Sequence, residues 1–304
     1  IFILKRLVAN THPNLSYLSR EDLLKTPEEL YSKKNYDIIK IFKHKNYTIK
    51  SVNEISRTEN LSFEEVVEKY IGIKQDPRYK KFDPIASFVS EGHKHGLKVH
   101  AWFEYGFSSS YSANGGSIVA AKPEWAAKDL NNQLVVKNGF DWLNGLHPQV
   151  QQFMVDLFKE VVNKYNVDGV QGDDRLPAMP STGGYDAYTV NLYKSENGGA
   201  NPPPSPTDAG WLKWRADKLN VFLKRLRTEV KAIKPTILFT MSPSPYPFGY
   251  TEYLQDWPTW VDSAWVDAII PQIYRYNITD YDNSINQQKS YYKNTAVPFY
   301  PGVL

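Results

Sequence analysis

Residues 165–176 read YNVDGVQGDDRL, a short apolar segment followed directly by two acidic residues. The pattern predicts a buried strand over residues 167–171, because a helical pattern precedes it and Gly172 interrupts the apolar run. Asp173 and Asp174 then stand where the strand ends and a loop begins, the position at which a parallel α/β barrel carries its chemistry. Since adjacent side chains in extended backbone point to opposite faces, we expect one acid to face a site while the other holds a neighbour.

Predicted strands and helices alternate along the rest of the chain. Periodicity, caps and turn residues predict further strands over residues 1–9, 36–42, 97–103, 236–242, 266–274 and 297–303. They predict helices over residues 19–34, 83–96, 148–165, 211–234, part of 252–264, and 281–293. Residues 43–82 are polar and irregular apart from a helical piece at 63–70, so we expect an excursion from the compact body. The alternation itself indicates parallel strands joined by crossover helices.

A TIM-type (β/α)8 barrel with long strand-to-helix loops fits this order better than an open doubly wound sheet. No strand is followed by a G-x-G-x-x-G or P-loop turn, and the candidate polar residues all follow predicted strands. We therefore expect residues 1–304 to form a single barrel domain. Seven strands are predicted, so the barrel is expected to be incomplete at the C-terminus or to close irregularly.

Composition limits the classes of function. The chain has 41% hydrophobic and 23% charged residues with a net charge of +3, which is typical of a globular protein and too small to argue for nucleic acid. No apolar run reaches the roughly 20 residues of a transmembrane helix. Cysteine is absent, which excludes disulfides and thiolate metal sites. The 8 Trp, 21 Tyr and 14 Phe make up 14% of the chain, and such rings in loops would suit the faces of sugars.

The sequence favours neither a catalytic metal nor another cofactor. His93, His95 and His100 show no H-E-x-x-H or comparable ligand spacing. No Gly-x-Ser-x-Gly elbow for a serine hydrolase is present either. A glycan esterase or deacetylase is therefore disfavoured.

Six segments in order resemble the successive motifs of the glycosyl hydrolase-like family 10. They are residues 100–104 (HAWFE), 143–150 (LNGLHPQV), 168–174 (DGVQGDD), 211–217 (WLKWRAD), 254–257 (LQDW) and 270–275 (IPQIYR). The resemblance extends from Asp83 to Leu304 and is weaker before it. Gly145 stands where the family commonly has Pro, and Gly172 where it commonly has a bulky residue.

The resemblance implies a TIM barrel and an activity on glycans. The family occurs in bacterial and especially cyanobacterial envelopes and includes hydrolases of peptidoglycan glycan strands stripped of their peptides. It thus implies a polysaccharide substrate, with a periplasmic, cell-envelope or secreted location. The chain does not begin with Met, so the question of whether a signal peptide was removed stays open.

Three acids at strand ends are the expected catalytic residues. Glycoside hydrolysis normally needs one protonated and one ionised carboxyl group. Our hypothesis makes Asp174 the general acid or base and Glu104 or Asp173 its partner, because like charges held close raise one pKa. A substrate-assisted route, in which the sugar's own N-acetyl group is the nucleophile, stays open. Asp168 precedes its strand and is interpreted as a turn or cap residue.

Further residues are expected to bind the substrate. Aromatic side chains could form stacking platforms, whereas Trp102, inside a predicted strand, is interpreted as core. Polar groups at the last strand end could bind sugar hydroxyls or an acidic lactyl group, and one amide could position a loop. The predicted binding residues are Tyr105, Trp142, Asn144, Tyr185, Trp257, Gln272, Tyr274 and Arg275.

The resulting prediction is a glycoside hydrolase acting on an envelope or extracellular polysaccharide, and a polysaccharide with N-acetylated amino sugars is the favoured substrate. The alternative is a non-catalytic carbohydrate-binding or scaffold protein on the same fold, since an aromatic cleft can bind glycan without cutting it. Linkage, anomeric outcome, protein partners and oligomeric state stay open at this stage.

Overall fold

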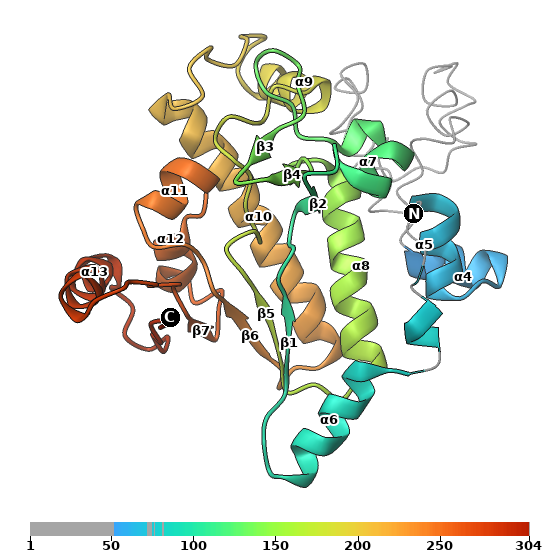
Figure 1. Cartoon of the computed structure of the whole chain (residues 1–304). Helices are drawn as coiled ribbons and strands as arrows, with labels where there is room; N and C mark the ends of the chain where they lie inside the picture. Colours follow the sequence, from blue (N-terminus) through green and yellow to red (C-terminus); the bar gives the residue numbers. More distant parts are fainter. Residues whose placement is uncertain (1–51, 72–74, 76, 81, 304) are drawn as a thin grey trace, which may run out of the picture.

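The structure is a computed structural model that describes residues 52–71, 75, 77–80 and 82–303 (Figure 1). The predicted strands at 1–9 and 36–42 and the predicted helix at 19–34 lie outside the described residues, as does the first part of the excursion, residues 43–51. All three candidate catalytic acids lie within residues 82–303.

A parallel sheet forms the centre of the molecule. Its strands are β1 (His100–Phe103), β5 (Gly169–Gly172), β6 (Leu238–Met241) and β7 (Ala268–Ile269), in the order β1-β5-β6-β7. Isolated parallel bridges then join Ile269 to Phe299 and Gln272 to Gly302, which places the predicted strand at 297–303 beside β7. Four predicted strands therefore exist, and their order in the sheet follows the sequence. Within the described residues the sheet does not close on itself into a barrel.

Helices connect the strands as predicted. The main ones are α6 (Pro84–Lys94), α8 (Pro148–Lys164), α10 (Ala209–Ile233) and α13 (Ile278–Tyr291), with the short α11 (Phe248–Tyr253) and α12 (Trp257–Asp262) between β6 and β7. Helices α8 and α10 pack against each other and run alongside the sheet (Figure 1). Their buried faces and the sheet enclose a core that includes Phe158, Phe222 and Phe239. None of the helices in the described part of the chain is both long and apolar enough to cross a bilayer.

Capping residues set the helix starts. Asp83 accepts a hydrogen bond from the Ala86 backbone N–H at 3.0 Å, and Pro84 occupies the first turn, where its missing N–H leaves no bond unmade. Gly96, just past the end of α6, has φ of +70°, a conformation that favours glycine. These local signals explain why the predicted helix over 83–96 agrees with α6.

Two aspartates join neighbouring strands at the N-terminal end of the sheet. Asp168 accepts hydrogen bonds from the Val99 backbone N–H at 2.7 Å and shares one with His93 Nε2 at 2.8 Å. In the same way, Asp267 accepts the Phe239 N–H at 2.7 Å. Asp168 is thus a structural residue as predicted, although it caps the neighbouring strand rather than its own turn.

The segment between β1 and α8, predicted as a loop, contains a second sheet. Strands β2 (Ser108–Tyr111), β3 (Val136–Lys137) and β4 (Phe140–Trp142) pair antiparallel in the order β2-β4-β3, with α7 (Gly116–Ala121) between β2 and β3. The β3–β4 turn is Asn138-Gly139, with φ of +52° and +79°, which are residue types suited to a tight hairpin. Helix α5 (Phe63–Ile71) matches the helical piece predicted at 63–70, and the structure adds α4 (Val52–Glu59) and α9 (Ala187–Glu196) to the predicted elements.

Candidate active site

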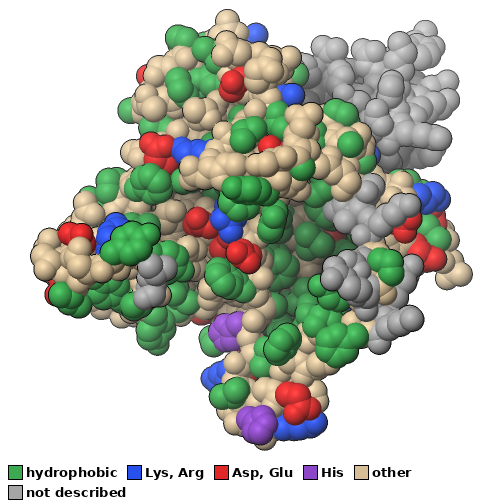
Figure 2. All heavy atoms as spheres, viewed as in Figure 1, with side chains coloured by type: hydrophobic (Ala, Val, Ile, Leu, Met, Phe, Trp, Pro, Cys, Tyr) green, Lys and Arg blue, Asp and Glu red, His purple; other side chains and the backbone are tan. Residues whose placement is uncertain are grey.

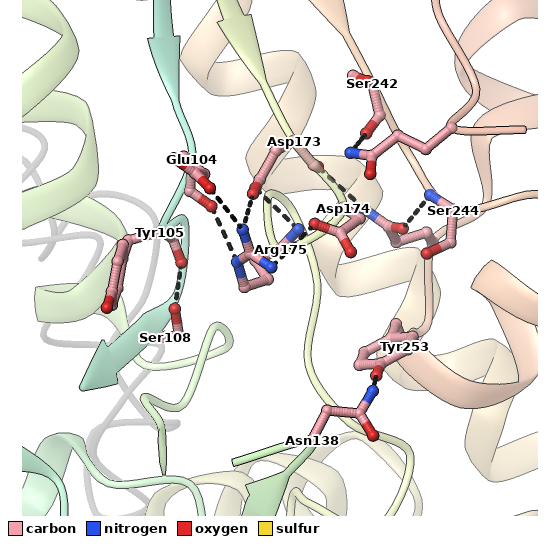
Figure 3. Close-up of polar contacts among 12 residues, drawn as sticks. Glu104, Tyr105, Ser108, Asn138, Asp173, Asp174, Arg175, Ser242, Ser244 and Tyr253 are labelled. Carbon is pink, nitrogen blue, oxygen red and sulfur yellow. Dashed lines mark hydrogen bonds and ion pairs between the residues drawn. The ribbon is translucent and has the colours of Figure 1, made fainter. Parts of the chain in front are cut away.

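One guanidinium group lies at the centre of the three candidate acids. Strand β5 ends at Gly172, so Asp173, Asp174 and Arg175 follow at the C-terminal end of the sheet. Arg175 Nη2 lies 2.6 Å from Asp173 Oδ2 and 3.9 Å from Glu104 Oε1, and Nη1 lies 3.2 Å from Asp174 Oδ1. Arg175 Nε also donates to the Glu104 carbonyl at 2.9 Å. Figure 3 shows Glu104 and Asp174 on opposite sides of the Arg175 side chain.

The three acids differ sharply in exposure. The Asp173 side chain is 0% exposed, that of Asp174 29% and that of Glu104 65%. One of the adjacent aspartates therefore faces outward while the other holds Arg175, as expected from alternation along extended backbone. Figure 2 shows acidic and basic side chains meeting in a hollow of the surface, bordered by hydrophobic side chains. Asp174 and Glu104 are the acids that a ligand can touch.

Burial favours the protonated form of the Asp173 carboxyl group. Burial raises the pKa of Asp173 to about 8; the Arg175 charge opposes this rise, and the Asp174 carboxylate adds to it. Asp173 Oδ1 accepts the Arg175 backbone N–H at 2.9 Å. Its Oδ2 lies close to the guanidinium but without the geometry of a hydrogen bond, and in the described part of the chain no hydrogen bond reaches this buried atom. Such a carboxyl group is a suitable store for a proton.

Hydrogen bonds from Gln255 and Phe107 hold the backbone around the acids. Gln255 is buried; its Oε1 accepts the Ser244 N–H at 3.1 Å and its Nε2 donates to the Asp173 carbonyl at 3.4 Å. The Phe107 N–H donates to the Arg175 carbonyl at 2.9 Å. A Cβ on Gly106, where φ is +51°, would lie 2.2 Å from that same carbonyl oxygen. Only glycine allows the two backbones to approach this closely.

Gly172 stands where a bulky residue is common in the resembled family, and β6 fills the space instead. A Cβ on Gly172 would lie 2.6 Å from Met241 Sδ and 3.2 Å from the Leu176 carbonyl oxygen. The Met241 side chain thus occupies the room that a larger residue at 172 would need.

The β3–β4 hairpin crosses this end of the sheet from the β1 side to α11. The Phe140 ring centroid lies 4.6 Å from the Arg175 guanidinium carbon. Lys137 makes a short ion pair with Glu252 and lies 4.6 Å from the Tyr253 ring centroid. Asn138 Nδ2 donates to the Tyr253 hydroxyl at 2.9 Å (Figure 3). The hairpin therefore covers one face of Arg175, and Lys137 and Asn138 bind it to α11.

Two tyrosines experience the field of Asp174. Burial raises the pKa of Tyr253 to about 12, and Asp174 adds to this. Burial, followed by Asp174, also raises the pKa of Tyr274. Both phenols therefore stay protonated at neutral pH and lie within electrostatic reach of Asp174.

Four predicted binding residues follow strands β1 and β7 at the C-terminal end of the sheet. Tyr105 and Tyr274 are 52% and 41% exposed, and Arg275 is exposed with its Nη1 donating to the Tyr274 carbonyl at 2.8 Å. Gln272 is partly buried, and its Nε2 donates to the Ser242 carbonyl at 2.9 Å. Tyr105, Tyr274 and Arg275 thus keep accessible side chains, whereas the Gln272 amide nitrogen braces a strand end.

Three other predicted binding residues are buried, so their predicted role is corrected, whereas Tyr185 is partly exposed and its role stays a prediction. Trp142 and Trp257 are 1% and 0% exposed, so their rings pack in the core and have no free face for a sugar. Asn144 is fully buried, with Nδ2 donating to Thr189 and Oδ1 accepting the Leu146 N–H. The Tyr185 ring packs on Trp211, and its hydroxyl donates to the Pro203 carbonyl.

The interpretation of Trp102 as a core residue was also wrong, since it is 52% exposed. Sequence reasoning missed Arg175, Phe140 and Tyr253. A cation directly after two acids was a usable signal for Arg175. Phe140 and Tyr253 come close to the acids only through long-range packing, so no local pattern identifies them.

Nothing in the arrangement is built for a metal ion. In residues that the structure describes, no group of three or more His, Asp or Glu side chains is placed to bind one. The space where the carboxylates converge is filled by the Arg175 guanidinium. The arrangement can instead present two accessible acids and a fixed cation to a polar ligand, with a third acid buried behind them.

Comparison with known proteins identifies the family. The profile of the family described as Glycosyl hydrolase-like 10 matches residues 20–304, so the chain belongs to this family. It is 29% identical over 231 residues to the glycosyl hydrolase DigH of Escherichia coli K12, covering 66% of this chain and 48% of DigH. It is 26% identical over 259 residues to the glycosyl hydrolase YngK of Bacillus subtilis 168, covering 75% of this chain and 46% of YngK. The chain spans about half the length of these relatives.

Among solved structures, the fold is similar to the PgaB (BpsB) glycoside hydrolase domain from Bordetella bronchiseptica. The TM-score is 0.53 at 15% sequence identity, covering 68% of this chain and 62% of that one. The likeness shows the fold alone: an α/β arrangement of parallel strands and helices also found in a glycoside hydrolase.

Proposed function

We propose that this member of the glycosyl hydrolase-like 10 family hydrolyses glycosidic bonds in an envelope or extracellular polysaccharide. The substrate class is a chain with N-acetylated amino sugars, such as peptidoglycan glycan strands without peptides. One observation carries the proposal: Glu104, Asp173 and Asp174 surround Arg175, and one of these acids is fully buried, which raises its pKa. The relatives DigH and YngK, both named glycosyl hydrolases, support it.

In the proposed reaction Asp174 is the general acid. It protonates the glycosidic oxygen, the bond from the anomeric carbon to that oxygen breaks, and the electron pair stays with the leaving oxygen. Asp173 has no exposed surface, so it acts as a positioning residue that shares its proton with Asp174. Glu104, across the guanidinium, accepts a proton from the water whose oxygen bonds to the anomeric carbon. Exchange with solvent then restores both acids.

The architecture we infer for the whole chain is a single (β/α)8 barrel domain with long strand-to-helix loops, with residues 43–82 as an excursion. The sequential order β1-β5-β6-β7 and the parallel bridges to Phe299 and Gly302 support it. In such a barrel the C-terminal ends of the strands form one face, and the three acids follow strands β1 and β5 on that face.

The release of reducing ends from peptide-free peptidoglycan glycan tests the function. We expect Asp174→Asn to lower the rate by about 10²–10⁴-fold, the usual contribution of a general acid. Asp282→Asn, an exposed aspartate on α13, is the matched control and should leave the rate unchanged. Wild-type protein that is retained on the glycan yet produces no new ends would contradict hydrolysis and favour a carbohydrate-binding protein.

A further inference from the structure

A continuous aromatic surface adjoins Arg175. We call it the aromatic shelf, and it consists of Tyr105, Tyr111 and Phe140. The Phe140 ring centroid lies 5.8 Å from that of Tyr105 and 5.2 Å from that of Tyr111, with an interplanar angle of 78° in both cases. The Phe140 ring centroid also lies 4.6 Å from the guanidinium carbon of Arg175. The shelf therefore runs without a break from the acids' common cation to the protein surface.

The shelf is rigidly built although two of its rings are exposed. The Ser108 N–H and hydroxyl both donate to the Tyr105 carbonyl, at 2.9 and 2.5 Å, and fix the turn that carries Tyr105 (Figure 3). A Cβ on Gly139 would lie 2.6 Å from the Tyr111 ring, so that ring rests directly on glycine backbone. Tyr105 and Tyr111 are nevertheless 52% and 58% exposed. Rings held in place before binding lose little conformational entropy when a ligand covers them.

An accessible aromatic residue also lies beyond the acids on the opposite side. Tyr274 follows β7, whereas Tyr105 follows β1, and Asp174 follows β5 between them. Three strand intervals of about 4.8 Å separate β1 from β7, roughly 14 Å in all. That span is longer than one sugar ring, so a ligand that touches both sides must be a chain.

We propose that the aromatic shelf binds sugar rings on one side of the scissile bond and, together with Tyr274 on the other, makes the enzyme cleave within a glycan chain. The inference rests on the proposed function and specifies its substrate as an oligomer. The apolar C–H face of a pyranose can pack on a ring while its hydroxyl and acetamido groups stay hydrated. A protein partner fits less well, because two half-exposed tyrosines of about 150–250 Å² each leave far less accessible area than the roughly 500 Å² that each partner contributes to a specific protein interface.

The experiment compares peptide-free peptidoglycan fragments of two, four and eight sugars at concentrations below KM. We expect Tyr111→Ala to lower the hydrolysis rate of the eight-sugar fragment about tenfold and that of the disaccharide less than twofold. Tyr111→Phe keeps the ring and should match the wild type. Phe88→Ala removes an exposed ring from α6, at the other end of the sheet, and should change neither rate. Should Tyr111→Ala fail to fold, Tyr105→Ala takes its place.

The possible outcomes distinguish a failure of the role proposed for the aromatic shelf from a failure of the proposed hydrolase function. If wild-type protein cleaves but releases sugars only from a chain end, or if Tyr111→Ala slows all lengths equally, the shelf is overturned and hydrolysis stands. If no fragment is cleaved, calorimetric binding of the eight-sugar fragment that Tyr111→Ala weakens about tenfold supports the shelf and overturns hydrolysis. If the wild type neither cleaves nor binds the eight-sugar fragment, both are overturned.

Discussion

Asp168 and Asp173 lie at opposite ends of the same strand, β5, and have opposite electrostatic states. Hydrogen bonds from the Val99 N–H and then from His93 lower the pKa of Asp168. Burial raises the pKa of Asp173 to about 8. The same residue type is therefore held ionised at one end of the sheet and protonated at the other.

The difference follows from the polarity of a parallel sheet. At the N-terminal end the strands leave backbone N–H groups free, and the carboxylates of Asp168 and Asp267 accept them. At the C-terminal end the free groups are carbonyls, and these are bound by donors from Arg175, Gln255 and Gln272. Strand ends there offer the acids few backbone donors, so the acids meet one cation and one another instead. The N-terminal end thus contributes stability, and the C-terminal end can supply reactive carboxyl groups.

Replacing Arg175 should have the largest effect on stability. We expect Arg175→Met to cost about 3 kcal/mol, because it removes a charged donor, whose hydrogen bonds contribute about 1.5–3 kcal/mol each, from the Glu104 carbonyl and leaves the buried Asp173 carboxyl group without its guanidinium neighbour. Arg175→Lys keeps the charge but has one nitrogen in place of the two that contact the three acids, so we expect a smaller loss. Urea unfolding at pH 7 measures both. A loss below about 1 kcal/mol for Arg175→Met would mean that the cation does not hold this end of the sheet together.

A comparison of two glycines should separate backbone strain from steric contact. Gly96 and Gly106 both have positive φ, but a Cβ at Gly96 meets nothing within 4 Å, whereas one at Gly106 would lie 2.2 Å from the Arg175 carbonyl oxygen. Gly96→Ala should cost about 1 kcal/mol from φ alone, and Gly106→Ala about 2–3 kcal/mol with a fall in activity, because the Arg175 loop must move. Equal losses in thermal unfolding would show that the close approach at Gly106 is unimportant.

The two aspartates of β5 should respond to pH in opposite directions. The depressed pKa of Asp168 stabilises the fold above its unfolded value near 3.9, and this contribution is lost as pH falls through the folded value. Asp168→Asn should therefore cost about 1–2 kcal/mol at pH 7 and less near pH 3.

Asp173 has the raised pKa, so its contribution is present below pH 4 and is lost as pH rises toward about 8. The stability of Asp173→Asn relative to wild type should consequently improve between pH 4 and pH 8. Urea unfolding of both variants from pH 3 to pH 8 is the measurement. Parallel pH profiles for Asp168→Asn and Asp173→Asn would remove the distinction between the two ends.

Glu104→Gln should have the smallest effect on stability and still impair the proposed reaction. Its side chain is 65% exposed, and its carboxylate lies 3.9 Å from Arg175, so we expect a change within about 0.5 kcal/mol. Hydrolysis of peptide-free glycan should fall at least tenfold, because the acid that accepts the proton from water is neutralised. Full activity in Glu104→Gln would assign that role to another group.

The parts of the fold that were predicted from the sequence are those set by local patterns. Helices α8 and α10 have long apolar faces, and Pro148 and Pro235 lie beside their ends. The acids after β1 and β5 were found because each directly follows a short apolar run. The Asn138-Gly139 turn was an equally local sign of the β3–β4 hairpin, but it lies in a polar segment that was interpreted as a loop.

The parts that could not be predicted depend on packing. Trp142 and Trp257 are indistinguishable in composition from exposed stacking residues, and only the tertiary structure places them in the core. Trp102 shows the converse. Strand β7 has only two residues, where nine were predicted over 266–274, because apolar periodicity continues through Pro271 although the regular pairing does not.

The protonation state of Asp173 is the most direct test of this account. Carbon-13 NMR of the aspartate carboxyl groups, with Asp173→Asn to assign the signal, measures the pKa in the folded protein. A buried acid that stores the proton for Asp174 should titrate near pH 8. Titration of Asp173 near pH 4, together with Asp168, would show that the two ends of the sheet do not differ and would remove the proposed source of the catalytic proton.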